Sequence, residues 1–323
     1  MIRISAGTAY MMGLKKIKID ETPTTGYLML GEGCANNCAY CAQSKDSYEG
    51  NGKLSRVTWP KYDIESLIKG LKKGEEKGLK RLCIQEVKST DNNSEYIDIT
   101  ELIKLVKKNS NLPVSLSSTV NNLKKIEELL NLGVDKIGVS LDVCSPEKYP
   151  EYKSGLFSKR LNFIKSAARK YPGKISTHLI VGLGESDYEL LSIAKDLVNS
   201  NVNIALFAFT PLQGTRLSHK SPPTLERYRK IQAVTYLLKN KLIKFDKLLF
   251  DDKGKLVGID ISSNKLIDVL SSGQAFITMG CSNCNRPFYN EKPHDTPFNY
   301  PRNLSKVEKS EAIKMLLNNL KTN

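Results

Sequence analysis

Residues 33–43 read Gly-Cys-Ala-Asn-Asn-Cys-Ala-Tyr-Cys-Ala-Gln and contain three of the chain's seven cysteines, Cys34, Cys38 and Cys41. The Cys-x3-Cys-x2-Cys spacing lets one short loop wrap three thiolates around three irons of a [4Fe–4S] cube, since such clusters are normally held by cysteine thiolates. A closed structural metal site takes four protein ligands, but no Cys or His follows Cys41 until Cys83. The stretch therefore predicts a cluster whose fourth iron is open to a bound molecule.

With an aromatic residue, Tyr40, directly before the third cysteine, the motif resembles the signature of the radical S-adenosylmethionine (SAM) enzymes. In that family the amino and carboxylate groups of SAM occupy the open iron, and the cluster loop follows the first strand. Here the loop follows a strand-like run at residues 27–30. A zinc site is the alternative interpretation, because Cys-x2-Cys is also a zinc-binding pattern.

Length and cysteine usage bound the class of protein. The 323 residues allow one large domain or two ordinary ones. No apolar run approaches the ~20 residues that span a bilayer, and residues 1–18 lack the continuous apolar stretch of a signal peptide. An odd number of cysteines, three of them in one loop, indicates reduced thiols and metal binding rather than disulfides. We therefore expect a cytoplasmic protein without a membrane partner.

The chain is basic, with 49 Lys and Arg against 34 Asp and Glu and a net charge of +15. A positive field attracts nucleic acid or an acidic protein. Much of the excess lies in helix-like segments such as residues 69–73 and 104–108, where lysines usually form a solvated face. No basic run is interleaved with aromatic side chains, as a nucleic-acid stacking surface requires. We therefore do not expect nucleic acid to bind, and the charge by itself assigns no partner.

Short β-rich runs alternate with amphipathic helical runs through the middle of the chain, which predicts parallel strands joined by helical crossovers. The expected strands are residues 27–30, 81–85, 114–117, 136–141, 174–181 and 204–209. The expected helices are residues 63–77, 98–109, 121–132, 156–169 and 187–199. Six strands make an α/β fold of the partial (β/α)6 TIM-barrel type, two units short of the complete barrel. The resemblance implies the same radical SAM core, with an open side that admits a large substrate.

The pattern divides the chain into three parts. Residues 1–24 form an N-terminal extension, residues 25–222 the partial barrel, and residues 223–323 a C-terminal extension. In this last part the sequence predicts two helices and a hairpin, at residues 224–240, 305–320 and 245–259, respectively.

Over residues 25–220 the chain resembles the biotin synthase branch of the radical SAM family. Residues 180–185, Ile-Val-Gly-Leu-Gly-Glu, look like that branch's fifth-strand SAM motif, where glycines let the backbone approach adenine. Ser140-Leu141-Asp142 resembles the Asn-Leu-Asp of biotin synthases, which makes Asp142 a hydrogen-bond acceptor for ribose or substrate. The resemblance implies these cofactor-binding residues: Tyr40, Glu86, Ser140, Asp142, Gly182, Gly184 and Glu185, with Glu86 on the SAM amino group. An ordinary strand-end turn and a solvent-facing Asp are the alternatives for the glycines and for Asp142.

One departure from biotin synthases concerns a second cluster, which those enzymes hold inside the barrel with three cysteines and an arginine. Cys83 matches the first of these cysteines, but serines stand at the other two positions, Ser176 and Ser115 or a neighbour of Ser115. Because serine binds iron poorly beside thiolate, we expect the [2Fe–2S] site of biotin synthase to be absent.

The C-terminal region carries Cys281 and Cys284 in a Cys-x2-Cys pair followed by Asn-Arg-Pro-Phe-Tyr-Asn-Glu, residues 285–291. This stretch resembles the terminal motif of two-component, archaeal-type lipoyl synthases, which are biotin-synthase-like proteins that work in pairs. The resemblance implies an auxiliary Fe–S cluster at the pair, with Cys83 and Cys144 as further ligands if the tail folds over the barrel mouth. The alternatives are a zinc knuckle at the pair and burial of Cys83 and Cys144 as small hydrophobic side chains.

The resemblance implies a sulfur-insertion enzyme with Cys34, Cys38 and Cys41 as catalytic cluster ligands. The reduced cluster passes an electron to SAM, methionine leaves, and a 5′-deoxyadenosyl radical takes hydrogen from an aliphatic carbon, which an auxiliary-cluster sulfide then captures. The implied substrate is an octanoyl chain on a lysine of a lipoyl-carrier protein. The implied partners are a second radical SAM subunit and an electron donor such as a ferredoxin. A biotin synthase-like enzyme, or another radical SAM enzyme acting on an aliphatic or RNA substrate, is the alternative.

Overall fold

The computed structural model describes residues 1–31, 33–48, 52–88, 95–292, 294–318 and 320–323. Its centre is an eight-stranded sheet in the order β10-β9-β8-β7-β6-β2-β1-β5. Six neighbouring strands are parallel: β2 (Thr25–Leu30), β6 (Arg81–Glu86), β7 (Val114–Ser118), β8 (Lys136–Val139), β9 (Ile175–Val181) and β10 (Asn203–Ala208). The predicted six-stranded partial barrel is confirmed, and the observed strand bounds lie within two residues of those expected.

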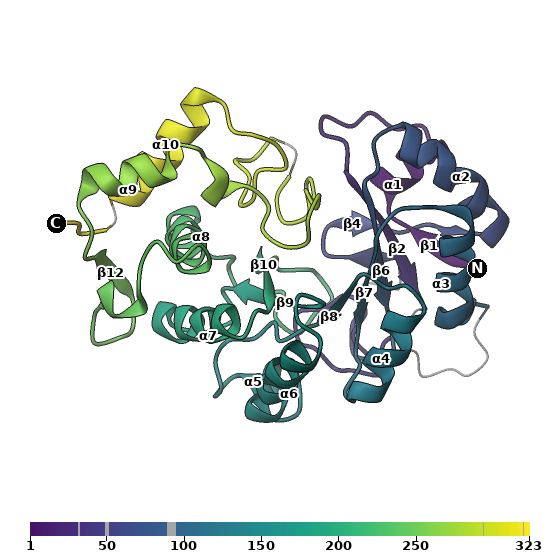
Figure 1. The fold of residues 1–323 in the computed structure, drawn as a ribbon, viewed down its shortest axis with the longest axis horizontal. Helices are drawn as coiled ribbons and strands as arrows, with labels where there is room; N and C mark the ends of the chain where they lie inside the picture. Colours follow the sequence, from purple (N-terminus) through teal and green to yellow (C-terminus); the bar gives the residue numbers. More distant parts are fainter. Residues whose placement is uncertain (32, 49–51, 89–94, 293, 319) are drawn as a thin grey trace.

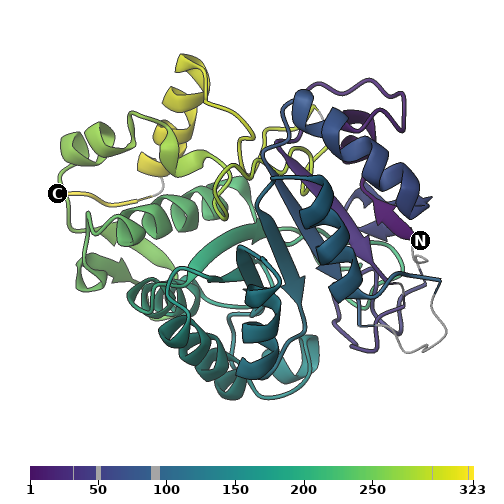
Figure 2. The same ribbon diagram turned by 45° about the vertical axis from the view of Figure 1, so that its right-hand side comes forward.

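Helices connect these strands and cover their outer face (Figures 1 and 2). They are α2 (Ile64–Glu76), α3 (Ile99–Asn109), α4 (Leu123–Asn131), α5 (Tyr149–Tyr152), α6 (Phe157–Lys170) and α7 (Asp187–Asn199). Four of them begin at a residue whose side chain accepts a hydrogen bond from a backbone N–H of the first turn: Asp63, Asp98, Asn122 and Ser186.

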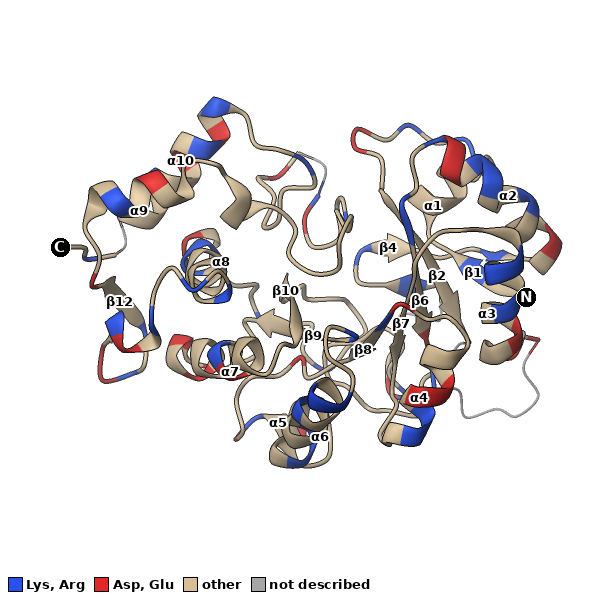
Figure 3. Cartoon of the chain, viewed as in Figure 1, with Lys and Arg blue, Asp and Glu red and all other residues tan. Residues whose placement is uncertain are grey.

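Most of the basic residues of these helices face solvent. In α2 the buried residues include Leu67 and Leu71, while Lys69 and Lys72 are exposed. Figure 3 marks Lys and Arg residues along α2, α3, α4 and α6. Much of the positive charge is therefore a solvated helical surface, as the sequence pattern indicated.

The N-terminal residues belong to the sheet, which the sequence did not predict. Strand β1 (Ile2–Ile4) pairs antiparallel with β2 on one side and with β5 (Lys61–Tyr62) on the other. Helix α1 (Ala6–Met11) and the small antiparallel pair β3 (Lys53–Leu54) and β4 (Val57–Thr58) complete this part.

The C-terminal region begins with α8 (Leu225–Lys239), which packs against α7. It continues through η1 (Phe245–Lys247), the hairpin β11 (Leu248–Phe250) and β12 (Leu256–Ile259), α9 (Ser263–Leu270), η2 (Gln274–Phe276) and α10 (Lys306–Leu317). Helix α10 packs against α8 and α9, and Figure 1 shows these helices to one side of the barrel. Within the described ranges no helix combines the length and apolar character that a membrane span needs.

Alternate strand residues point into the barrel lumen, because successive residues of a strand face opposite sides. The lumen is lined by Arg81, Cys83 and Gln85 of β6, by Ser176, His178 and Ile180 of β9, and by Ala205 and Phe207 of β10. The residues between them, such as Leu82, Ile84 and Leu179, are buried in the hydrophobic core. The sheet thus carries polar and thiol side chains on its inner face and aliphatic ones on its outer face.

Candidate active site

The loop of three cysteines follows β2 at the carboxyl end of the barrel strands, where barrel active sites are built. Within the loop the Cys34 N–H donates to the Gln43 carbonyl at 2.8 Å. Neighbouring segments hold it from outside, since the Ala39 N–H donates to the Tyr152 carbonyl at 2.8 Å and the Leu217 N–H to the Ala39 carbonyl at 3.1 Å. The motif therefore folds into a loop fixed by α5 and by the segment after β10.

Burial is the largest influence on the pKa of two loop thiols, Cys38 and Cys41. It raises the pKa of Cys38, and it raises the pKa of Cys41 to about 12, with neighbouring thiols adding to the effect. Iron binding displaces such protons, because a coordinating thiol is deprotonated. Within the described ranges no three His, Cys, Asp or Glu side chains surround a single metal ion. An iron–sulfur cluster does not need three side chains around one ion, since each thiolate binds a separate iron.

Asp142 connects the cysteine loop to the parallel sheet. Its carboxylate accepts a hydrogen bond from the Tyr40 hydroxyl at 2.7 Å, forms an ion pair with Lys153, and lies 3.8 Å from Nδ1 of His178. Burial by itself raises the pKa of Asp142, but Lys153, His178 and Tyr40 together lower it below its ordinary value. Burial also lowers the pKa of His178 to about 4. Near pH 7 the site therefore holds the Asp142 carboxylate beside a neutral His178 imidazole. Asp142 is only 8% exposed, so the alternative of a solvent-facing residue is wrong.

Two cations near Asp142 were not predicted from the sequence. Lys153 Nζ donates to the hydroxyl of Ser140 at 2.9 Å, and Arg160 Nε donates to the carbonyl of Ser140 at 3.1 Å. Ser140 and Asp142 both line the lumen, as expected of cofactor-binding residues. The only sequence signal for the two cations is their position on or next to the helices that follow the Ser-Leu-Asp stretch.

The glycine turn after β9 needs its glycines for geometric reasons. Gly182 and Gly184 have φ angles of +105° and +92°, in the region that favours glycine. A Cβ at Gly182 would lie 3.0 Å from Cδ of Pro223 and 3.3 Å from Cβ of Phe209. The backbone therefore approaches its neighbours more closely here than a larger residue would allow.

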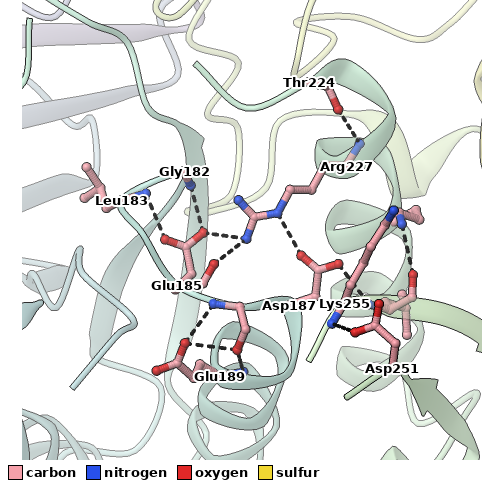
Figure 4. Close-up of polar contacts among 12 residues, drawn as sticks. Gly182, Leu183, Glu185, Asp187, Glu189, Thr224, Arg227, Asp251 and Lys255 are labelled. Carbon is pink, nitrogen blue, oxygen red and sulfur yellow. Dashed lines mark hydrogen bonds and ion pairs between the residues drawn. The ribbon is translucent and has the colours of Figure 1, made fainter. Parts of the chain in front are cut away.

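Glu185 takes its partners from within the protein (Figure 4). Its carboxylate accepts hydrogen bonds from the N–H groups of Gly182 and Leu183, both at 2.8 Å, and from Arg227 at 2.9 Å. Burial raises the pKa of Glu185, and Arg227 opposes this effect. Because the side chain does not line the lumen, any effect of Glu185 on SAM runs through the shape of the turn.

Glu86 ends β6 and accepts a hydrogen bond from the hydroxyl of Ser118 at the end of β7. It lies at the carboxyl end of the strands, the correct end for a cofactor contact, but outside the residues that line the lumen. Its contact with the SAM amino group stays a prediction.

A segment of the C-terminal region, residues 278–291, lies across the open side of the barrel; we call it the tail segment. Next to β2, the Thr24 hydroxyl donates to the Asn283 carbonyl at 2.6 Å. Along β10, Nδ2 of Asn290 donates to the Ala208 carbonyl at 2.7 Å. The side that the sequence analysis left open for a large substrate is thus occupied by the chain itself.

The tail segment brings Cys281 and Cys284 into the lumen beside Cys83. The hydroxyl of Tyr27 lies 3.2 Å from Sγ of Cys284, and that of Ser115 lies 3.6 Å from Sγ of Cys281. Burial raises the pKa of Cys83, and the two tail thiols add to the effect, as expected for thiols close together. The structure therefore assembles a second set of three cysteines from distant parts of the sequence.

The serines that distinguish this chain from biotin synthases lie beside the second set. Ser115 and Ser176 both line the lumen. Arg81 joins Ser115 to the tail, since its Nη1 donates to the Ser115 hydroxyl at 2.8 Å and its Nε to the Ser282 carbonyl at 3.1 Å. The charge of Arg81 is balanced by Asp135 at 2.9 Å. The tail segment thus brings two thiols into the part of the lumen where β7 and β9 carry the hydroxyls of Ser115 and Ser176.

Cys144 does not join this set. It is fully buried within the hydrophobic core and does not line the lumen. For Cys144 the structure favours the alternative of a small buried hydrophobic side chain. Of the two further ligands expected for the tail pair, only Cys83 lies with it.

Glu291, at the end of the tail segment, makes stability depend on pH. Burial raises its pKa from 4.5 to about 7, so the folded chain keeps this proton between those values while the unfolded chain loses it. Stability should therefore fall as pH rises from 4.5 through 7. In urea unfolding of metal-free protein, Glu291→Gln should gain roughly 2–4 kcal/mol relative to wild type between pH 5 and pH 8. Parallel pH profiles of the two proteins would contradict this account.

Cys41 and the second set line one cavity. Part of its wall is apolar and consists of Leu54, Trp59, Ile180, Phe207, Phe209 and Leu212. An apolar wall favours an aliphatic ligand, because both surfaces leave water on binding.

Comparison with known families decides the class of the protein. The family model described as the radical SAM superfamily matches residues 28–197, more than half of the chain. The chain belongs to the radical SAM superfamily. Since this family implies a [4Fe–4S] cluster and SAM, the chain is a radical SAM enzyme, and the matched region contains both the cysteine loop and the glycine turn.

The radical SAM chain has curated relatives at low identity. It is 25% identical to the biotin synthase of Acetivibrio thermocellus over 57% of this chain and 56% of that protein. It is 28% identical to the biotin synthase of Lawsonia intracellularis over 64% of this chain and 65% of that protein. The match thus spans little more than half the length of the first relative and under two thirds of the second.

Solved structures agree on the radical SAM fold. The crystal structure of HydG, a maturase of the [FeFe]-hydrogenase, superposes with a TM-score of 0.54 at 16% sequence identity. The superposition covers 76% of this chain and 53% of that chain. At this identity the likeness establishes the fold alone.

The side chains around the loop fit the needs of a radical SAM site. Cys34, Cys38 and Cys41 are the three thiols that would hold the cluster. Ser140 and Asp142 offer hydroxyl and carboxylate groups on the adjoining lumen wall, where SAM would need partners for its hydroxyl and amino groups. The donor set therefore matches the group that the family implies.

Proposed function

We propose that this chain is a sulfur-insertion enzyme of the lipoyl synthase type, which acts on an octanoyl chain attached to a lysine of a lipoyl-carrier protein. One observation carries the proposal. Cys83, Cys281 and Cys284 line the same cavity as Cys41, so a second iron–sulfur cluster would share a space with the radical-generating site.

When bound, the first cluster and SAM supply a 5′-deoxyadenosyl radical that removes a hydrogen atom, and a second cluster supplies the sulfur that replaces it. The chain's own residues position and protect the substrate. The apolar side chains of Trp59, Phe207 and Phe209 line the cavity and keep water from it. Tyr40 and Asp142 tie the cysteine loop to the sheet, which fixes the loop relative to the lumen.

A biotin synthase-like activity is the alternative, because the curated relatives carry that name. The lumen argues against the biotin synthase ligand set, since Ser115 and Ser176 stand where thiols are expected. A ligand set built from the tail supports the lipoyl synthase type instead.

The proposed partners follow from the proposed substrate. They are the octanoylated carrier, a second radical SAM subunit that installs the other sulfur, and a low-potential electron donor such as a ferredoxin. The net charge of +15 suits an acidic carrier domain. The proposed setting is the cytoplasm, where thiols remain reduced.

The first test asks whether the tail set holds iron. A Cys34→Ala, Cys38→Ala, Cys41→Ala variant is reconstituted anaerobically, and its iron and acid-labile sulfide are measured. We expect substantial iron with matching sulfide, and its loss when Cys83→Ala is added. Absence of iron from the triple variant would sink the sulfur-insertion proposal.

The second test concerns the substrate. Wild-type enzyme with SAM and a reductant is given an octanoyl-lysine peptide from a lipoyl carrier or, in parallel, dethiobiotin. Mass spectrometry should show sulfur added to the octanoyl chain and none to dethiobiotin. The opposite result would favour the biotin synthase-like alternative.

A further inference from the structure

Arg286 places a guanidinium in the lumen wall. The residue is 8% exposed, and its Nη2 donates to the carbonyls of Met279 at 2.7 Å and Leu206 at 3.3 Å. Its guanidinium carbon lies 3.9 Å from the centroid of the Phe207 ring. These contacts orient the group, but carbonyl dipoles and a ring face do not neutralise its charge.

Two of the other charges near the lumen are balanced. Asp142 is paired with Lys153, and Arg81 with Asp135. In the part of the chain that the structure describes, no Asp or Glu lies within ion-pair distance of Arg286. The charge of Arg286 lowers the pKa of the more distant Glu291, but burial still raises that pKa to about 7. A buried charge without a counter-ion is costly, so the lumen around Arg286 is suited to an anion.

A cluster held by the second cysteine set would provide that anion. Arg286 lines the same lumen as Cys83, Cys281 and Cys284, and it follows Cys284 by two positions on the tail segment. Three thiolates outweigh the double positive charge of an oxidised four-iron core, so a cluster held by this set carries net negative charge. The uncompensated cation and the site of the proposed anion therefore occupy one cavity.

We propose that Arg286 supplies the compensating charge for the cluster at Cys83, Cys281 and Cys284 and raises its reduction potential. Reduction adds negative charge, so a fixed cation nearby stabilises the reduced form, and net charge and hydrogen bonding are established controls of such potentials. Arg286 is thus a positioning and tuning residue. The inference rests on the proposed function, since it requires the second cluster.

The experiment uses the full chain with Cys34→Ala, Cys38→Ala and Cys41→Ala, so that any cluster signal comes from the second set. Arg286→Gln removes the charge but keeps an amide donor, and Arg286→Lys keeps the charge. The midpoint potential is followed by redox titration with paramagnetic resonance, together with iron content and thermal unfolding of the metal-free protein. The reference is the triple-alanine protein with Arg286 intact. Relative to it, we expect a more negative potential and less iron in Arg286→Gln, and nearly the same potential and iron content in Arg286→Lys.

Arg229 provides a matched control. It is 1% exposed, bonds to the carbonyls of Pro297 and Phe298, and stacks over the Tyr300 ring at 5.2 Å, but it does not line the lumen. Arg229→Gln should lower the unfolding temperature and leave the midpoint potential unchanged.

The outcomes separate the two claims. A background protein without iron overturns the proposed function and the role of Arg286 with it. A loaded Arg286→Gln protein with unchanged potential overturns only the role of Arg286. Failure of Arg286→Gln to load supports that role if Arg286→Lys loads and the metal-free proteins unfold alike. Arg286 is merely structural if Arg286→Gln unfolds at as low a temperature as Arg229→Gln and Arg286→Lys also fails to bind iron.

Discussion

Replacing Cys41 by alanine is expected to abolish cleavage of SAM, with 5′-deoxyadenosine formation falling by more than about 100-fold. Residues that only support a metal ligand already cost about 10–100-fold when replaced, and Cys41 is one of three thiols available to the first cluster. The assay is chromatographic measurement of 5′-deoxyadenosine after anaerobic reconstitution, with SAM and dithionite present.

Cys144→Ala is the control for this experiment, because Cys144 is buried in the core and does not line the lumen. It should retain the iron content and the 5′-deoxyadenosine yield of wild type. Equal losses in Cys41→Ala and Cys144→Ala would show that cysteine replacement disturbs folding, and the assignment of the loop would fail.

Replacing Cys83 by alanine should separate radical formation from sulfur transfer. Cys83 lies with the tail cysteines, so the variant should lose sulfur insertion by more than about 100-fold while the cysteine loop remains intact. Formation of 5′-deoxyadenosine should continue. The measurement is the ratio of sulfurated product to 5′-deoxyadenosine in the same reaction.

A Cys281→Ala, Cys284→Ala variant should give the same ratio as Cys83→Ala, because the three thiols are proposed to hold one cluster. Sulfur insertion that survives in either variant would rule out this set as the sulfur source. Loss of 5′-deoxyadenosine in both variants would instead place the tail in the radical-generating site.

The local pattern was enough to predict the barrel. Strand and helix periodicity located the six parallel strands, the crossover helices α2, α3, α4, α6 and α7, and α8, because each of these helices buries an aliphatic face. It missed the short elements β3, β4, β5 and α5. The spacing of Cys34, Cys38 and Cys41 likewise identified the loop, since all three ligands lie within a few residues of each other.

Contacts between distant segments could not be predicted in the same way. Periodicity does not show that the tail crosses the open side of the barrel, or that Cys83 rather than Cys144 meets the tail pair. Lys153 and Arg160 were missed because helical cations usually face solvent, whereas these two turn toward Ser140. The role of Glu185 depends on Arg227, which belongs to another helix.

The tail segment also sets an order of assembly. Tyr27 and Cys284 touch in the lumen although they are 257 positions apart in the chain. Synthesis proceeds at about 5–20 residues per second, with N-terminal parts folding first. The cysteine loop therefore leaves the ribosome well before the wall that carries Cys281 and Cys284. All three loop cysteines are therefore in the chain long before the second cysteine set can assemble, which must wait until the tail has been made.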